Sequence, residues 1–199
     1  MPHRLFYPAT ERNREPILDV LKTVMPDQGH ILELASGSGE HVIHFAGYFK
    51  ALTWQPSDLE DEALKSIQSW IQHKELSNVH PPLKLNTTEP QWPLETADAI
   101  LCINMIHISP WQATIGLMDK ASKLLPKGGF LYLYGPFRVD GKQTSPSNEA
   151  FDGWLKEKDT RFGVRDMAEV ESLANQQGLK LNQKIPMPSN NFSLVFHKD

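Results

Sequence analysis

The sequence predicts an α/β fold: a mostly parallel, seven-stranded sheet whose last two strands form an antiparallel hairpin. An apolar strand at residues 31–34 runs into a turn of small residues, 35–39, and then into a helix with one apolar face. Further apolar strand segments alternate with helical segments, which is typical of parallel sheets. The final strand segments, 180–185 and 192–197, are separated by too few residues for a crossover helix, so they must pair antiparallel.

Length and composition fit one domain. The chain has 199 residues, 40% of them hydrophobic, so we expect residues 1–199 to form a single domain with an insertion at 136–165. No apolar run approaches the roughly 18 residues of a membrane helix. The N-terminus lacks the apolar segment of a signal peptide. The single cysteine, Cys102, is expected to be a buried thiol, which suits a cytoplasmic location.

The turn after the first strand is the clearest indication of a ligand. The acidic Glu33 lies inside the strand, and the turn has the pattern Ala35-x-Gly37-x-Gly39. A strand, a tight turn and a helix N-terminus bring backbone N–H groups against a nucleotide-like ligand. A dinucleotide fingerprint, G-x-G-x-x-G, read from Gly37 would place its third glycine at Val42. The pattern therefore disfavours a nicotinamide-dependent oxidoreductase.

Asp58 follows the second predicted strand, 52–55, and lies 19 residues after Gly39. An acidic residue at this distance is placed at the tip of the strand, where its carboxylate can accept from ribose hydroxyls. The alternative is a helix N-cap, for which Asp is favoured. One residue can serve both roles.

The remaining elements follow from the same patterns. Strands are predicted at 83–86, 98–104 and 130–134, the second of them an almost unbroken apolar run. Capping boxes at 109–112 and 166–169 predict helices that end near residues 125 and 178. Pro16 suits the first turn of a helix that ends near Met25, which leaves 7–15 as a lead-in turn or short helix.

These segments resemble, in order, the motifs of the class I S-adenosylmethionine (SAM)-dependent methyltransferases. That family's first motif is an acidic residue followed by G-x-G-x-G, and here Ala35 replaces the first glycine. The segment 58–64 resembles the family's D-I-S-P-E-x-L type of sequence, and 104–107 resembles the N-x-x-H that follows the fourth strand. The resemblance implies a Rossmann-like class I methyltransferase fold with SAM as the cofactor.

The same resemblance implies a cofactor site. Asn86 stands where many members have an Asp that contacts the adenine amino group. Arg12 or Arg14 is a candidate partner for the SAM carboxylate, with exposed surface arginines as an equal alternative. The expected cofactor-binding residues are Glu33, Ala35, Ser36, Gly37, Ser38, Gly39, Asp58, Leu59, Asn86, Thr87, Asn104, Met105, Arg12 and Asn13.

Over nearly its full length the chain also resembles a narrower group, a domain of unknown function that includes methyltransferase-like protein 26. The shared marks include Trp-Gln-Pro-Ser-Asp at 54–58, Ser-Asn-x-x-Phe-Asp at 147–152 and Gly-x-Arg-Asp at 163–166. This resemblance implies SAM binding and brings no established substrate.

Three segments fall outside the cofactor scaffold: 7–15, the insertion 136–165 and the hairpin connection 187–191. Ligands of open α/β sheets bind beyond the carboxyl ends of the strands, where the last two segments are expected. The expected substrate-side residues are Tyr7, Asn148, Asp152, Arg161, Arg165, Asn190 and Asn191. The alternatives are a local mini-core for the aromatic residues of the insertion and turn-forming asparagines in the hairpin.

The expected function is methyl transfer from SAM to a small molecule. Transfer from a sulfonium needs mainly alignment, and His107 is the candidate general base, with a structural histidine as the alternative. His41 and His44 lack a third ligand, so no metal site is expected. A net charge of −4 without a basic cluster does not favour nucleic acid. The alternative function is a non-catalytic sensor or partner module that binds SAM or its demethylated product, SAH.

Overall fold

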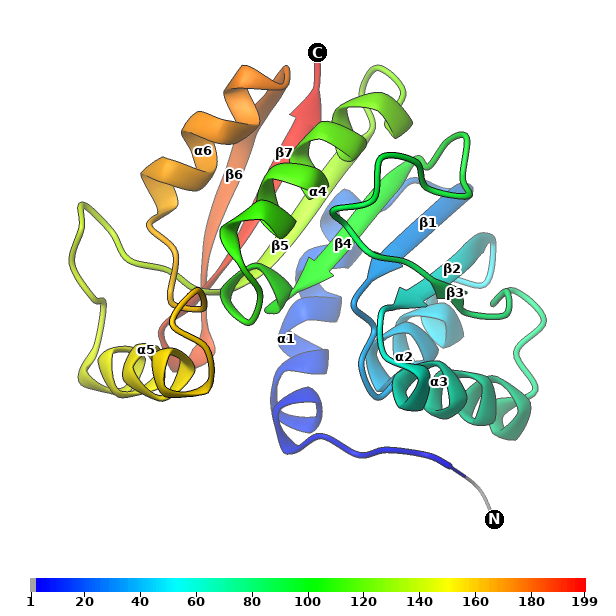
Figure 1. Cartoon of the computed structure of the whole chain (residues 1–199). Coiled ribbons are helices and arrows are strands. Elements are labelled where there is room, and N and C mark those ends of the chain that lie inside the picture. Colours follow the sequence, from blue (N-terminus) through cyan, green and yellow to red (C-terminus); the bar gives the residue numbers. More distant parts are fainter. Residues whose placement is uncertain (1–2) are drawn as a thin grey trace.

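The computed structural model describes residues 3–199 (Figure 1). The helices are α1 (Pro8–Val24), α2 (Glu40–Tyr48), α3 (Asp61–Lys74), α4 (Trp111–Leu124), α5 (Pro146–Lys158) and α6 (Met167–Gln176), with short 3-10 helices η1 (Met105–His107) and η2 (Pro188–Asn190). The strands are β1 (Gly29–Leu34), β2 (Leu52–Asp58), β3 (Leu83–Lys84), β4 (Ala99–Ile103), β5 (Phe130–Pro136), β6 (Leu179–Met187) and β7 (Asn191–Lys198).

The strands form one seven-stranded mixed sheet in the order β3-β2-β1-β4-β5-β7-β6. Neighbours from β3 through β5 pair in parallel, whereas β7 is antiparallel to both β5 and β6. The predicted α/β fold with its C-terminal hairpin is therefore confirmed. In this order β1 and β4 lie side by side at the centre, so the turns that follow them meet at one edge of the sheet.

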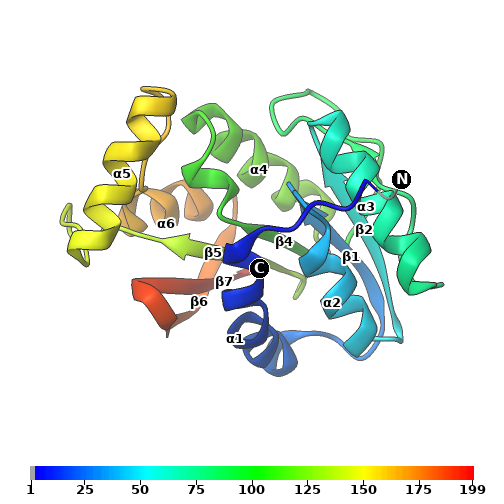
Figure 2. The same ribbon diagram turned by 90° about the horizontal axis from the view of Figure 1, so that it is seen from below.

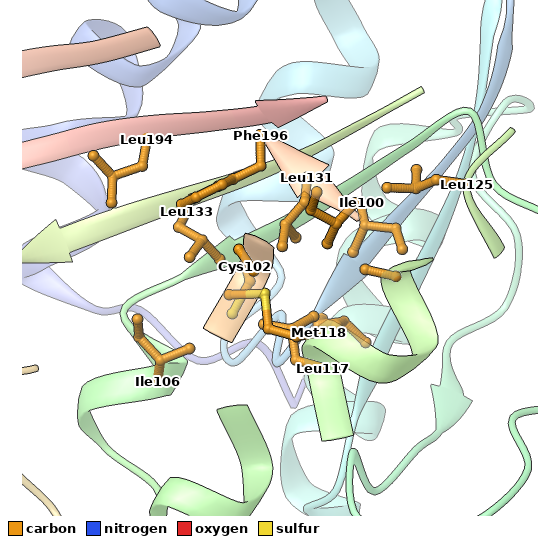
Figure 3. Packing of buried hydrophobic residues seen from close by; sticks show 14 of the residues in the cluster. Ile100, Cys102, Ile106, Leu117, Met118, Leu125, Leu131, Leu133, Leu194 and Phe196 are labelled. Carbon is orange, nitrogen blue, oxygen red and sulfur yellow. The ribbon is translucent and has the colours of Figure 1, made fainter. Parts of the chain in front are cut away.

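Two hydrophobic clusters cover the two faces of the sheet. On one face, Leu131 and Leu133 of β5 pack with Leu117 and Met118 of α4 and with residues of α6 (Figure 3). On the other face, α1, α2 and α3 bury a second apolar cluster against the same strands. Cys102 lies in the first cluster, as expected, and burial raises the pKa of its thiol to about 12, so it stays protonated.

The prediction that Pro16 lies in the first turn of the first helix is wrong. Helix α1 begins at Pro8, and Pro16 lies inside it. Proline is favoured in the first turn, where Pro8 stands, and it costs a hydrogen bond in the interior. The helix continues past Pro16 because Ile17, Leu18 and Leu21 are fully buried against the sheet. Tertiary packing thus outweighs the local preference of proline.

The predicted capping box at 109–112 is also wrong, because Pro110 is the N-cap of α4 and makes no side-chain bond. The Ser109 hydroxyl instead donates to the carbonyl of Met105 over 2.8 Å. Of the second predicted box, the N-cap is confirmed: the Asp166 carboxylate accepts from the N–H of Ala168 over 2.9 Å at the start of α6. Among residues 3–199, none of the helices has the length and apolar character needed to cross a membrane.

Candidate functional site

The turn between β1 and α2 has a left-handed backbone at three positions. Ala35, Gly37 and Gly39 have φ values of 52°, 56° and 89°. Ala35 adopts this conformation at a cost that glycine would not bear. A Cβ on Gly39 would lie 3.0 Å from the Cα of Ile67, so glycine permits the close approach of α3 to the turn.

Asp58 joins this turn to the end of β2. Its Oδ2 accepts from the backbone N–H of Gly37 over 2.8 Å, and its Oδ1 accepts from the backbone N–H of Glu60 over 3.0 Å. Glu60 is the N-cap of α3, so the interpretation of Asp58 as the helix N-cap is wrong. Each carboxylate oxygen retains acceptor capacity for a ligand hydroxyl.

Two adjoining cavities open along the carboxyl ends of β1, β2 and β4. The first has a volume of about 690 Å³ and lies between the turn and the start of α1. The second has a volume of about 610 Å³ and extends towards residues 85–88 and the start of α4. They share the residues Leu34, Ala35, Asp58, Glu60, Met105 and Ile108. We call the two cavities together the cleft.

Glu33 is an unpaired acid in the wall of the first cavity. It is only 2% exposed, and neither oxygen of its carboxylate has a hydrogen-bond partner among residues 3–199. Burial raises the pKa of Glu33 to about 8. A cationic ligand group in the cavity would compensate the buried charge, and an anionic one would oppose it.

Thr10, Asn13 and His41 are buried polar residues in the wall of the same cavity. His41 Nε2 lies 2.8 Å from Asn13 Oδ1. Burial lowers the pKa of His41 to about 3, so the imidazole is neutral and donates from Nε2 to the Asn13 amide oxygen. This pairing leaves the amide nitrogen of Asn13 as the donor end of that side chain.

The two arginines proposed for the SAM carboxylate do not reach the cleft. Arg12 is exposed on α1 and lines neither cavity. Arg14 lines a separate groove with His44 and Tyr48 of α2 and Trp70 of α3. Of the α1 residues predicted to bind the cofactor, only Asn13 lies in the wall of the cleft.

The second cavity is lined by Leu59, Asn86 and Thr87, among other residues. Asn86 Oδ1 accepts from the backbone N–H and the hydroxyl of Thr88, over 3.0 and 2.8 Å. These two bonds use the acceptor capacity of the amide oxygen, so the expected bond from an adenine amino group has no free oxygen to meet. The amide nitrogen of Asn86 remains as a donor for a ring nitrogen.

Asn104 and Met105 follow β4 and line the first cavity, and Asn104 has a left-handed backbone with φ of 63°. His107 is placed differently, because it is fully buried and lines neither cavity. Its Nδ1 accepts from the N–H of Arg165 over 3.2 Å, and its ring packs edge-on against Phe137. Burial lowers the pKa of His107 to about 3. This arrangement favours the structural interpretation over a general base.

The structure describes all seven predicted substrate-side residues, and of these only Tyr7 and Arg161 line the cleft. Tyr7 lies on the turn between β1 and α2, since a Cβ on Gly37 would come 3.2 Å from its ring. Arg161 lines the second cavity and forms an ion pair with Asp159, with 2.6 Å between Nη2 and Oδ2.

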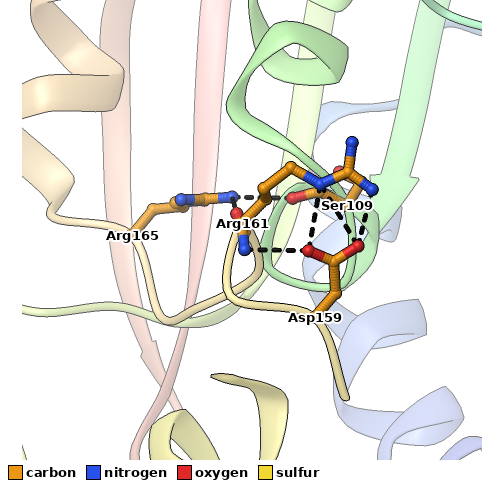
Figure 4. A network of polar contacts seen from close by, with 4 residues as sticks. All are labelled: Ser109, Asp159, Arg161 and Arg165. Carbon is orange, nitrogen blue, oxygen red and sulfur yellow. Dashed lines mark hydrogen bonds and ion pairs between the residues drawn. The ribbon is translucent and has the colours of Figure 1, made fainter. Parts of the chain in front are cut away.

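The other substrate-side candidates hold the insertion and the hairpin in place. Arg165 donates to the backbone carbonyls of Ile106, Ser109 and Arg161. Figure 4 shows Arg165 with two of these partners, Ser109 and Arg161. Asp152 accepts from the N–H of Val164 over 2.7 Å.

The asparagines of the hairpin region make similar structural bonds. Asn148 donates to the carbonyl of Asn190 over 2.9 Å. Asn190 has φ of 57°, and Asn191 donates to the carbonyl of Pro188, which agrees with turn formation.

Sequence reasoning missed several residues of the cleft: Thr10, His41, Glu60, Glu62, Ile108 and Gln112. Thr10 and Asn13 are three residues apart on α1 and therefore share a face, but the helix was predicted to begin after them. Ile108 directly follows the predicted motif 104–107, and this position was the available signal; in the structure its side chain is 44% exposed. Among residues 3–199, no group of three His, Cys, Asp or Glu side chains is placed to hold a metal ion.

Residues 4–198 match the model of a family described as a protein of unknown function, DUF938. Solved structures with the same fold are methyltransferases by name. An O-methyltransferase family protein from Burkholderia thailandensis has a TM-score of 0.82 at 16% identity, over 96% of this chain and 57% of that one. CalO1, a methyltransferase in calicheamicin biosynthesis solved in its SAH-bound form, has a TM-score of 0.76 at 14% identity, over 96% of this chain and 55% of that one.

A third similar structure matches over nearly its whole length. It is a candidate sarcosine dimethylglycine methyltransferase from Galdieria sulphuraria, with a TM-score of 0.76 at 12% identity, over 99% of this chain and 92% of that one. This chain spans little more than half of the first two structures and most of the third. At these identities the likeness establishes the methyltransferase-like fold.

Proposed function

We propose that this chain, which belongs to the DUF938 family, is a SAM-dependent methyltransferase that acts on a small-molecule acceptor. The observation that carries the proposal is the unpaired, buried carboxylate of Glu33 in a cavity beside the glycine turn. SAM is a nucleoside that carries an ammonium and a sulfonium. Its cationic end complements Glu33, and its ribose hydroxyls complement the remaining acceptor capacity of Asp58.

The charge of the cleft argues against a dinucleotide. Glu33, Asp58, Glu60 and Glu62 all line the first cavity. A pyrophosphate would meet these carboxylates, and it would compete with Asp58 for the N–H of Gly37, which Asp58 already accepts. A cation is favoured by the same arrangement.

Each part of the cleft has a role in holding the cofactor. Glu33, Thr10 and Asn13 suit the amino-acid end, and Asp58 suits the ribose. Leu59 and Ile108 offer exposed apolar side chains where a flat base would pack. When bound, SAM supplies an activated methyl group, so the protein's own contribution is alignment and exclusion of water.

A small-molecule acceptor is supported by the shape and charge of the cleft. The cavities are of the size that small ligands occupy. The net charge is −4 and acidic residues surround the first cavity, which opposes the approach of phosphate backbones.

One observation favours the second candidate function, a protein that binds SAM or SAH without turnover. His107, the predicted general base, is sealed from both cavities. An acceptor that arrives deprotonated needs no base. The burial of His107 is therefore compatible with catalysis if the acceptor is of that kind, and otherwise it favours binding without turnover.

Calorimetry and labelled turnover test the proposal together. We expect SAM and SAH to bind wild-type protein and NAD to bind far more weakly. The Glu33→Gln variant should lose much of this preference for ligands that carry an ammonium over NAD. Labelled SAM incubated with protein and a cell extract should then yield a labelled small molecule that mass spectrometry identifies. Binding of NAD without SAM would overturn the proposal, and SAM binding without any labelled product would favour the sensor.

A further inference from the structure

An N-terminal segment, which we call the strap (His3–Tyr7), crosses from the start of α1 to α3 (Figures 1 and 2). It precedes the helix and has no regular secondary structure. Leu5 and Tyr7 of the strap line the first cavity. The strap therefore forms one wall of the cavity in which we place the cofactor.

The strap is fastened to the glycine turn through two side chains that both contact Ser38. Ser66 of α3 accepts from the N–H of Leu5 over 2.8 Å and donates to the carbonyl of Ser38 over 2.6 Å. Glu40 Oε2 accepts from the N–H of Tyr7 over 2.8 Å and from the Ser38 hydroxyl over 2.8 Å. The N–H groups of alternate strap residues thus reach the turn by separate bridges.

Trp70 of α3 provides a further contact. Its Nε1 donates to the carbonyl of Leu5 over 3.2 Å, and Phe6 meets its ring edge-on with the centroids 5.1 Å apart. The Arg4 guanidinium lies 5.0 Å from the centroid of the same ring. Phe6 is 64% exposed, so its contact with Trp70 holds the strap without filling the core.

We propose that the strap is a gate on the cofactor cavity, and that Ser66 and Glu40 are positioning residues that hold it shut against the glycine turn. The proposal rests on the proposed function, because it assigns the ligand behind the gate as SAM or SAH. The strap lies along one wall of the cavity, and Tyr7 lies against Gly37. In this proposal a nucleoside enters and leaves when the strap moves away from the turn, and the fastenings limit both rates.

Exchange kinetics of labelled SAH test this idea in the full chain. We expect Phe6→Ala and Ser66→Ala to raise the association and dissociation rates together, each by about 2- to 10-fold, as the loss of one such contact allows. The dissociation constant should change less than 2-fold. Asp61→Asn, on the same helix and paired with Lys84 away from the strap, is the control and should retain wild-type rates. Phe6→Ala removes an exposed side chain and keeps the test valid if Ser66→Ala does not fold.

Amide hydrogen exchange gives a second readout that needs no ligand. In wild-type protein the N–H groups of Leu5 and Tyr7 should be protected, and Phe6→Ala should speed their exchange by a factor similar to that of SAH release. Unchanged rates in the folded variants, or faster dissociation with unchanged association, would overturn the gate. Failure of wild-type protein to bind SAH would overturn the proposed function and its gate together, whereas SAH binding with unaltered kinetics overturns the gate alone.

Discussion

The backbone N–H of Gly37 donates to the carboxylate of Asp58 over 2.8 Å, which ties the turn after β1 to the end of β2. The other oxygen of the same carboxylate accepts from Glu60, at the start of α3. Asp58 therefore shapes the cleft before any ligand arrives. A substitution at this position is expected to change stability and affinity together.

Asp58→Asn tests this double role. An asparagine has one acceptor oxygen, so one of the two backbone N–H groups would face its NH₂ and lose its partner. We expect a loss of about 1–3 kcal/mol in the free energy of unfolding, measured by urea denaturation. SAM affinity, measured by calorimetry, should fall about 10- to 150-fold with the loss of charge-assisted bonds.

Asp61→Asn is the matched control for Asp58→Asn, because Asp61 is an exposed acid at the start of α3 whose one ion-pair partner within residues 3–199 is Lys84 on the surface. It should stay within about 0.5 kcal/mol of wild type and bind SAM normally. Reduced stability of Asp58→Asn with unaltered SAM affinity would remove Asp58 from the cofactor site and leave it a purely structural role.

Glu33 predicts the pH dependence of SAM binding. Its pKa is raised to about 8 by burial, so the carboxyl is largely protonated near neutrality, and a cationic ligand binds best when it is ionised. Between pH 5.5 and 7 the SAM ammonium stays charged, so affinity should rise with pH, by up to about tenfold per unit. Calorimetry across this range measures the slope, and Glu33→Gln should abolish it. A pH-independent wild-type affinity would contradict the pairing of Glu33 with the cation.

Three buried groups predict the pH of maximum stability in the unliganded protein. Glu33 has a raised pKa, so it lowers stability as pH rises from about 4.5 to about 8. His41 and His107 have pKa values lowered to about 3, so their contribution is present above about 6.5 and is lost as pH falls towards 3. Below pH 6.5 the stability that the two histidines lose on acidification exceeds the stability that the glutamate gains.

We therefore expect the melting temperature of the unliganded protein to peak near pH 6.5, with changes of about 1.4 kcal/mol per pH unit for each group in its window. Differential scanning calorimetry from pH 5 to 8 measures the peak. In Glu33→Gln the decline above pH 6.5 should be weaker, while the decline on the acid side remains. A wild-type melting temperature that rises steadily from pH 6.5 to 8 would contradict the assignment of Glu33.

The fold was predictable because its signals are local. The apolar run of β4 predicts a central strand, and the short connection between β6 and β7 excludes a crossover helix. The position of Pro16 was predicted wrongly because the local preference of proline for a first turn is outweighed by the free energy of burying the α1 residues that follow it. Burial of that kind depends on partners that are distant in sequence.

The turn after β1 was predictable for the same reason, since its glycines come shortly after β1 and Asp58 is the last residue of β2. The pairing of His41 with Asn13 was not, because it arises where α1 packs beside α2. The burial of His107 was also hidden, since it depends on the distant residues Phe137 and Arg165. Residue type left a base and a structural histidine as alternatives there, and the tertiary contacts favour the structural one.

Lysine substitutions of Arg165 and Arg161 should differ in their effect on stability, although both residues lie in the insertion (Figure 4). Arg165 donates to three backbone carbonyls, and lysine cannot reproduce that fork. Arg165→Lys should therefore cost about 1–3 kcal/mol in the free energy of unfolding, because the part-buried carbonyls of Ile106 and Ser109 lose their donor. Urea denaturation measures this cost.

Arg161 is exposed and lines the second cavity, and its only charged partner among the described residues is Asp159. Arg161→Lys should change stability by less than about 0.5 kcal/mol, because a surface ion pair contributes little. Its effect should appear in ligand binding instead, as weaker affinity for SAM or for an acceptor at the second cavity. If Arg165→Lys were as stable as wild type and Arg161→Lys were the destabilised variant, the roles assigned to the two arginines would be reversed.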